Sequence, residues 1–175
     1  MKAVVIYASQ TGFTKQYAQW ICEESGAECV ELKKASKIKL AEYDAVVFGG
    51  WFMAGGIKKI DWFKKKIPEL SAAGKKLIVY AVGASPAEAP DAAESLKRNF
   101  TDDEWNAIKA FYCPGGLNYD KMGFGSKLTM KMLLRILSSK KDATKDDMRM
   151  VKMLSHSYDI SDKKYANPIV AELRS

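Results

Sequence analysis

Cysteine and histidine are scarce in this chain of 175 residues. It has three cysteines, Cys22, Cys29 and Cys113, and one histidine, His156. The cysteines show no C-x-x-C pair and no other metal-ligand spacing, and each has apolar neighbours in the sequence. These counts exclude a disulfide framework and disfavour a structural zinc site. We therefore expect reduced core thiols and no metal site.

Long apolar runs are also absent. No apolar stretch approaches the roughly 20 residues that a membrane-spanning helix needs. Lys2 leads straight into a short apolar run, so the N-terminus does not resemble a signal peptide. With 47% apolar and 28% charged residues, the composition is that of a globular protein, and the length suits one domain, 1–175. Together these features predict a cytoplasmic protein.

Two well-known nucleotide-binding motifs are missing as well. The chain contains no G-x-x-x-x-G-K-[ST], which argues against a P-loop NTPase, and no G-x-G-x-x-G after its first apolar run, which argues against a dinucleotide fold. Basic residues are dense at Lys33–Lys39, Lys58–Lys66 and Lys121–Lys152, but no nucleic-acid-binding module surrounds them. We therefore expect no nucleic-acid partner.

What is present is an alternation of apolar runs and amphipathic stretches. Five runs rich in β-branched or aromatic residues predict strands, at Ala3–Ala8, Glu28–Leu32, Ala45–Gly49, Leu77–Val82 and Ile108–Cys113. Helix-like stretches lie at Lys15–Ser25, Ile60–Leu70, Asp91–Asn99 and Asp162–Leu173. Because buried parallel strands are continuously apolar, the pattern predicts an α/β three-layer sandwich with a five-stranded parallel sheet. The strand order 2-1-3-4-5 suits five such units and places a ligand at the carboxyl ends of the strands.

The first predicted strand feeds directly into a turn rich in hydroxyl groups. Ser9-Gln10-Thr11-Gly12-Phe13-Thr14 joins it to the helix expected from Lys15. A helix N-terminus offers unpaired backbone N–H groups and the positive end of the helix dipole, which together attract phosphate. An ordinary helix cap is the alternative, but three hydroxyls and a glycine within six residues exceed what capping needs. The turn therefore predicts a phosphate site.

Glycines end three more of the predicted strands. Gly49-Gly50 precedes Trp51-Phe52-Met53-Ala54-Gly55-Gly56, Gly83-Ala84-Ser85-Pro86 follows strand four, and Gly115-Gly116 follows strand five. In a parallel sheet these loops leave the same edge as the first turn, and glycine lets the backbone approach a ligand. We expect Trp51 to stack on that ligand, with a core or lid aromatic as the alternative.

These features together resemble the flavodoxin family. The first turn resembles its [ST]-x-T-G-x-T phosphate loop, and the match is specific because the turn directly follows the first strand. The resemblance covers the chain to about Gly116 and implies a flavodoxin-like fold that binds FMN without a cation at the phosphate. The residues implied to bind FMN are Ser9, Gln10, Thr11, Gly12, Phe13 and Thr14 in the first turn, Gly50, Trp51, Phe52, Met53, Ala54 and Gly55 after strand three, and Gly83, Ala84 and Ser85 after strand four.

Two departures separate the chain from an electron-carrier flavodoxin. Those carriers are typically acidic, whereas this chain has a formal net charge of +7 and a pI near 9.2. The strand-four loop also lacks the aromatic residue that commonly covers the outer flavin face in them. We therefore expect one flavin face to be open to a substrate or covered by another segment.

A helical insertion expected at about 117–155 is a candidate for that cover. Gly115-Gly116-Leu117-Asn118-Tyr119 leads into a basic stretch rich in Met and Leu. This layout is similar to the quinone-dependent protoporphyrinogen dehydrogenase branch of flavodoxin-like proteins, in which G-x-L-x-Y precedes a long basic insertion. The resemblance implies a porphyrinogen-like substrate and a quinone acceptor, although Met53 stands where that branch has a basic residue.

Residues 127–138 predict an amphipathic helix within the insertion. At about 100° per residue, Lys127, Lys131, Arg135 and Ser138 share a narrow sector, and Leu, Met and Ile occupy most of the rest. Such a helix can lie at a membrane surface, which would make the protein peripheral there. It can equally contact a lipophilic substrate, pack on its own domain or form a homodimer.

The sequence thus predicts an FMN-dependent oxidoreductase whose electron partner is a quinone or a redox protein. The alternative is a non-enzymatic, flavodoxin-type electron-transfer protein. A binding module that has lost its flavin is disfavoured by the intact phosphate loop. No side chain stands out as catalytic.

Overall fold

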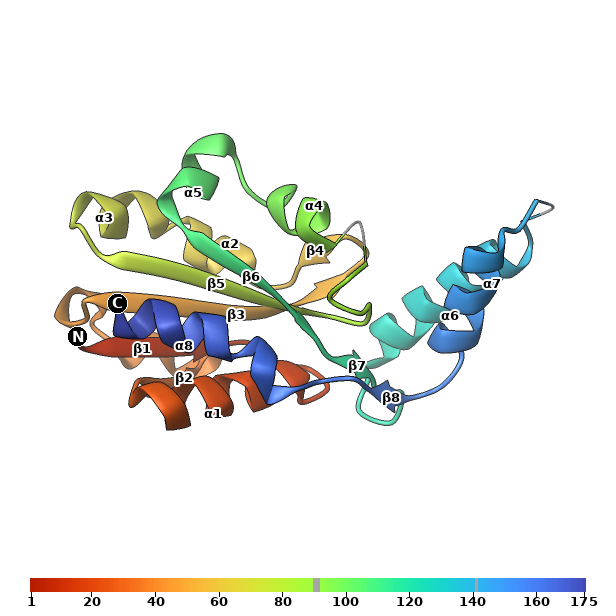
Figure 1. The fold of residues 1–175 in the computed structure, drawn as a ribbon, viewed down its shortest axis with the longest axis horizontal. Coiled ribbons are helices and arrows are strands. Elements are labelled where there is room, and N and C mark those ends of the chain that lie inside the picture. The colour runs from red at the N-terminus through yellow and green to blue at the C-terminus, as the bar shows by residue number, and fades with distance from the viewer. Residues whose placement is uncertain (90–91, 141) are drawn as a thin grey trace.

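The structure, a computed structural model, describes residues 1–89, 92–140 and 142–175. Its main sheet contains five parallel strands: β1 (Ala3–Tyr7), β2 (Glu28–Glu31), β3 (Ala45–Met53), β5 (Lys76–Gly83) and β6 (Lys109–Pro114). Their order is β2-β1-β3-β5-β6, and a short strand β4 (Gly56–Ile57) pairs antiparallel with β3. Counted along the chain, the parallel strands have the predicted order 2-1-3-4-5 (Figure 1).

Helices cover both faces of this sheet, as the three-layer prediction requires. One face carries α1 (Phe13–Ser25) and α8 (Asn167–Arg174), and the other carries α2 (Ile60–Lys64), α3 (Ile67–Ala72), α4 (Ala92–Lys97) and α5 (Asp102–Ala107) (Figure 1). Short 3-10 helices occupy Leu32–Lys37, Leu40–Glu42 and Lys163–Tyr165. The fold class expected from the sequence is confirmed.

The continuous apolar runs form strands because both of their faces are buried. Alternate residues such as Val4 and Ile6 point to the core under α2–α5, which includes the fully buried Phe63. Their neighbours, such as Val5, pack instead with α1 and α8 around Tyr17 and Tyr80. The result is two hydrophobic cores that share one sheet.

Strand β3 is longer than predicted, which corrects the expectation that Gly49-Gly50 ends it. The strand runs on to Met53 before the chain turns back into β4. Glycine is needed here for close packing, since a Cβ on Gly49 would lie 2.1 Å from Cζ of Tyr80 and one on Gly50 would lie 2.7 Å from Cγ2 of Ile57. These two glycines are packing residues inside a strand, and the turn comes later, at 54–55.

Two predicted helices are each broken near a proline. The stretch Ile60–Leu70 forms α2 and α3, with Pro68 in the first turn of α3. The stretch Asp162–Leu173 forms the 3-10 helix Lys163–Tyr165 and then α8, which has Pro168 in its first turn. Proline lacks the N–H that would continue the preceding helix, so a new helix begins beside it. The predicted helix Asp91–Asn99 corresponds to α4, and Asp91 itself lies outside the described residues.

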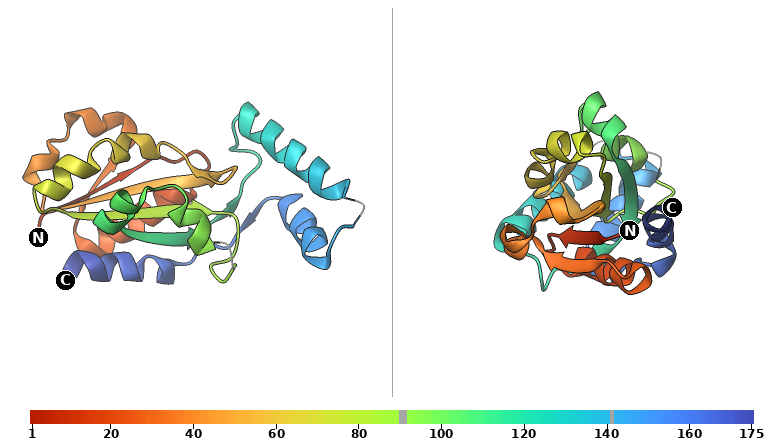
Figure 2. Two further views of the ribbon diagram at one scale, coloured as in Figure 1. Left: turned by 90° about the horizontal axis from the view of Figure 1, so that it is seen from above. Right: turned by 90° about the vertical axis from the view of Figure 1, so that its left-hand side faces the viewer.

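Helices α6 (Phe124–Ser138) and α7 (Lys145–Leu154) lie within the range 117–155 predicted as an insertion. They form a helical hairpin that projects beyond the carboxyl ends of the strands, away from the sandwich (Figures 1 and 2). A two-stranded antiparallel ribbon of β7 (Gly116–Leu117) and β8 (Tyr158–Asp159) joins the hairpin to the sandwich. A small hydrophobic core of its own holds this part of the chain together and contains Leu117, Met122, Met130, Leu137 and Leu154.

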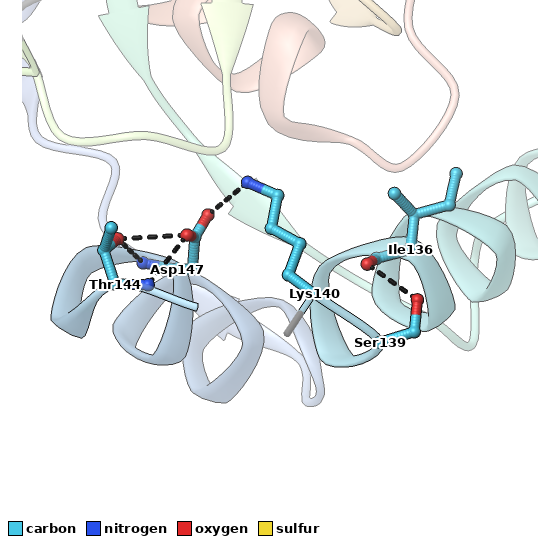
Figure 3. Close-up of polar contacts among 5 residues, drawn as sticks. All are labelled: Ile136, Ser139, Lys140, Thr144 and Asp147. Atoms are coloured by element: carbon cyan, nitrogen blue, oxygen red, sulfur yellow. Dashed lines mark hydrogen bonds and ion pairs between the residues drawn. The ribbon is translucent and has the colours of Figure 1, made fainter. Parts of the chain in front are cut away.

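Contacts at the hairpin turn tie its two helices together (Figure 3). Lys140 Nζ donates to Asp147 Oδ1 at 2.8 Å. Asp147 also completes a capping box with Thr144 at the start of α7. An ion pair and a cap thus share one carboxylate where α7 begins.

Tyr17 of α1 holds the chain where it leaves the sandwich and where it returns. Its hydroxyl donates to the Pro114 carbonyl at 2.6 Å and accepts from the Asp162 N–H at 3.2 Å. Burial raises the pKa of this phenol, so it stays protonated and keeps its donor. One buried side chain therefore links the two points at which the chain leaves the sandwich for the hairpin and returns from it.

The cysteines differ from the expectation of three core thiols. Cys113 is buried, Cys22 is partly buried and Cys29 is exposed. Among the described residues, no group of three or more His, Cys, Asp or Glu side chains could hold a metal ion. In that same part of the chain, no helix combines the length and apolar content needed to cross a membrane.

Candidate functional site

A cavity of about 400 Å³ lies at the carboxyl ends of the strands, the edge that the sequence predicts for the ligand. Twelve of the fifteen predicted site residues line it: Gln10, Thr11, Phe13, Thr14, Trp51, Phe52, Met53, Ala54, Gly55, Gly83, Ala84 and Ser85. Ser9, Gly12 and Gly50 do not. The volume falls within the roughly 300–1,000 Å³ typical of small-molecule sites.

The first turn has the backbone geometry of an anion site. Gly12 is the N-cap of α1 with a φ of 107°, in the left-handed region that favours glycine. Among the described residues no side chain caps this helix, so N–H groups of its first turn stay available. The Ser9 hydroxyl accepts from the Gly12 N–H at 3.2 Å, which places Ser9 as a support of the turn. Gly12 itself lines a second, neighbouring cavity of about 450 Å³, which Lys121 also lines.

The loop after β3 wraps one side of the cavity. Ala54 and Gly55 both have positive φ, 51° and 77°, which makes a tight turn into β4. Asn99 fixes this turn, because its side chain accepts from the Ile57 N–H at 2.8 Å and donates to the Gly55 carbonyl at 3.2 Å. Gly50 lies behind the loop, buried against Ile57.

Trp51 carries an unpaired polar group beside the cavity. Its indole Nε1 is buried and has no hydrogen-bond partner among the described residues. A buried donor without a partner costs free energy. The position of Trp51 in the cavity lining agrees with its predicted contact with the ligand.

Two tyrosines hold the loop after β5. The Tyr112 hydroxyl donates to the Ser85 carbonyl at 2.8 Å and accepts from the Ser85 N–H at 3.1 Å. The Tyr158 hydroxyl donates to the Ala84 carbonyl at 2.7 Å. Burial raises the pKa of Tyr158 to about 12, so its hydroxyl keeps this proton at neutral pH. Gly83 is required beside them, since a Cβ there would lie 2.2 Å from the Tyr112 oxygen.

The opposite wall comes from the insertion, and the sequence did not identify its residues individually. Its main members are Leu117, Met122, Met130, Leu133, Met150, Met153 and Leu154. The density of methionine between 122 and 153 was the available signal, because Met fills irregular surfaces. The Ser126 hydroxyl of α6 also donates to Gln10 Oε1 at 2.9 Å, which joins the insertion directly to the first turn.

The chemical character of the cavity is apolar and uncharged. Its lining in the described part of the chain contains no Asp, Glu, Lys, Arg or His. Its one phenol, Tyr112, is engaged with Ser85. The site can therefore bind and orient a ligand and exclude water from it, but these residues offer no strong acid or base.

Comparison with known proteins gives one family match. A family model described as a flavodoxin domain matches residues 4–144. Similar solved structures include a flavodoxin, WrbA-like protein from Agrobacterium tumefaciens, with 15% identity, coverage of 88% of this chain and 95% of that one, and a TM-score of 0.47. A flavodoxin from the domain Archaea is 16% identical, with 100% of both chains covered and a TM-score of 0.45. A flavoprotein from Lactobacillus acidophilus NCFM in complex with FMN is 14% identical, with 65% of this chain and 91% of that one covered and a TM-score of 0.45.

A search of curated proteins finds no match.

Proposed function

Because the chain belongs to the flavodoxin family and its cofactor is FMN, we propose that it is a cytoplasmic FMN-dependent oxidoreductase with an apolar organic substrate. The substrate is protoporphyrinogen-like and the electron acceptor is a quinone. The observation that carries this proposal is that helices α6 and α7 line the same cavity as the three predicted flavin loops. An electron carrier commonly covers the outer flavin face with one aromatic residue, whereas here two helices contribute apolar side chains to the cavity.

The residues present fit FMN. The uncapped first turn of α1, with Thr11 and Thr14, would hold its phosphate. Trp51 would pack on the ring system, and the loops that Asn99 and Tyr112 hold in place would contact its polar edge. When bound, FMN supplies the electron transfer.

The insertion would supply the substrate side of the site. Met130, Leu133 and Met150 present thioether and aliphatic surface, which suits the apolar ring system of a large organic molecule. Since the cavity lining has no strong acid or base, we expect the protein to act by binding and orientation. The resemblance of Gly115–Tyr119 and the basic insertion to the quinone-dependent branch supports the same substrate class.

The test is to remove the insertion without disturbing the sandwich. Leu117 pairs with Tyr158 in the ribbon, so residues 119–156 can be replaced by an Asn-Gly turn between Asn118 and Ser157. We expect the variant to keep FMN, seen in its visible spectrum, and its reduction by dithionite. Turnover of protoporphyrinogen with a quinone should be lost. Unchanged turnover would contradict the proposal, and a wild-type protein that exchanges electrons only with redox proteins would support the carrier alternative.

A matched pair of substitutions on α7 sharpens this test. Met150 lines the cavity, whereas Met148 on the same helix is 58% exposed and does not. Met150→Gln should raise KM for the organic substrate roughly tenfold, as expected for losing one apolar contact in a pocket. Met148→Gln should leave KM unchanged. Equal changes in KM from both substitutions would show that Met150 does not contact the substrate.

A further inference from the structure

Helix α6 carries a second apolar surface that faces away from its own core. Met130 and Leu137 are buried on one side of the helix. On the other side, Phe124, Leu128, Met132 and Ile136 are 85%, 51%, 58% and 58% exposed. These four residues are spaced four apart, so they form a continuous outer stripe about three turns long.

A row of cations runs beside the outer stripe. Lys127, Lys131 and Arg135 each directly precede a stripe residue and are also spaced four apart. Helix α6 contains no acidic residue at all. Across 117–155, nine basic residues stand against four acidic ones, so most of the chain's net charge of +7 lies in the insertion.

The hairpin is placed where an extended surface could reach it. It projects from the sandwich beyond the sheet (Figure 2). In the described part of the chain its connections to the sandwich include the β7–β8 ribbon, the cavity wall and the hydrogen bond from Ser126 to Gln10. Large apolar side chains are rarely exposed together in a monomer, so a contiguous stripe of this kind marks a contact surface.

We propose that the outer stripe of α6 docks on an anionic phospholipid surface. Phe124, Leu128, Met132 and Ile136 lie in the interface, and Lys127, Lys131 and Arg135 contact lipid phosphates. A second copy of the chain is the weaker fit, because α6 offers no carboxylate to pair with the cations of its twin. The helix lies on the membrane, since it is too short to cross one.

Vesicle flotation with the full, FMN-loaded chain tests this docking. The probes are vesicles of phosphatidylcholine alone and vesicles of equal parts phosphatidylcholine and phosphatidylglycerol. We expect binding to the anionic vesicles and little to the neutral ones. The double variant Leu128→Gln/Ile136→Gln should bind at least roughly tenfold more weakly, because the apolar part of interfacial binding is removed. Both side chains are exposed, so the fold should persist, as circular dichroism would verify.

A charge control separates docking from simple attraction. Lys131→Gln/Arg135→Gln removes two cations beside the stripe, and Lys37→Gln/Lys39→Gln removes two exposed cations from the sandwich. The first pair should weaken binding roughly tenfold or more, at about 1 kcal/mol per cation near the lipid, and the second should change it little. Equal losses in both would overturn the proposal, since net charge alone would explain the binding.

Two other results would also overturn it. One is wild-type protein that does not float with anionic vesicles. The other is a dimer in size-exclusion chromatography that Leu128→Gln/Ile136→Gln dissociates in the absence of any vesicle binding, because a second copy would then occupy the stripe. Neither result depends on which substrate the FMN site accepts.

Discussion

The sandwich and the α6–α7 hairpin use their apolar residues in opposite ways. Every one of the largest fully buried side chains, including Tyr80, Phe48 and Phe63, belongs to the sandwich. The hairpin and the segment that joins it to β7 bury five apolar residues in one cluster, each still 7–8% exposed except Leu154 at 6%. Of the nine large hydrophobic residues exposed in the described part of the chain, seven lie between Phe124 and Met150.

This contrast shows that much of the apolar side-chain surface of the insertion does not stabilise the fold. Burial of such side chains is the main driving force of folding, so leaving them in water forgoes that gain. In the hairpin, six of these seven residues line the cavity or form the outer stripe instead, and Met148 does neither. Matched substitutions in the sandwich and in the hairpin test this difference.

Core truncation should give the largest difference. Phe63 is fully buried and stacks on Phe48 with ring centroids 5.6 Å apart, so Phe63→Ala should cost about 3–5 kcal/mol of global stability. Leu137→Ala should cost about 2 kcal/mol and act mainly within the hairpin. Hydrogen exchange of the two regions during urea denaturation measures this. If Leu137→Ala destabilised the sandwich equally, the two regions would form one cooperative unit.

Replacing a glycine by alanine should lower stability in the sandwich and raise it in the hairpin. Gly49→Ala would drive a Cβ into the ring of Tyr80, whose hydroxyl donates to the Thr14 carbonyl at 3.0 Å. We expect a cost of about 1–3 kcal/mol or more, together with weaker FMN binding, because the strain reaches the first turn. Gly125→Ala in α6 has no described atom within 4 Å of the new Cβ and should stabilise the helix by about 0.5–1 kcal/mol. Melting temperatures and FMN titrations check both expectations.

Acid should destabilise the hairpin by protonating Asp147, and we expect this effect to be the smallest of the three predictions. The hydrogen bond from Lys140, and then those from Thr144, lower the pKa of this carboxyl from 3.8 to about 2. Because the folded value is the lower one, the contribution of Asp147 is present above its ordinary pKa and is lost as pH falls through about 2. Far-ultraviolet circular dichroism should show helix loss in this window.

Asp147→Asn is the control for that titration. It should show part of this helix loss already at neutral pH and a flatter dependence below pH 3.8. Identical acid profiles for the two proteins would contradict a role for the Lys140–Asp147–Thr144 contacts.

Much of the sandwich could be predicted from the sequence, because its strands are uniformly apolar and separated by clear helical periodicity. Four of the five strands end within one residue of their predicted bounds. The exception is β3, whose end was predicted too early because glycine is a turn signal in a sequence. Gly49 is needed instead for packing against the ring of Tyr80, which lies 31 positions further along. Helix α5 was missed although its capping box, Thr101 with Glu104, was a readable start signal.

The candidate site was predictable only on its sandwich side. The first turn and the loops after β3 and β5 line the cavity because the carboxyl ends of parallel strands share an edge. The insertion wall was not predictable, since α6 is apolar around most of its circumference. Its sequence does not reveal that Met130 turns inward while Met132, two positions later, stays in solvent.

The phenol of Tyr17 has a consequence for how this chain can vary. Because its hydroxyl holds Pro114 and Asp162 together, it closes the loop formed by everything between them. The entropy lost in closing a loop grows slowly, by about 0.6 kcal/mol for each doubling of length. The segment between Pro114 and Asp162 could therefore be longer or shorter at nearly the same entropic cost of closure. The closure that Tyr17 makes is therefore compatible with hairpins of different length, while the sheet remains constrained.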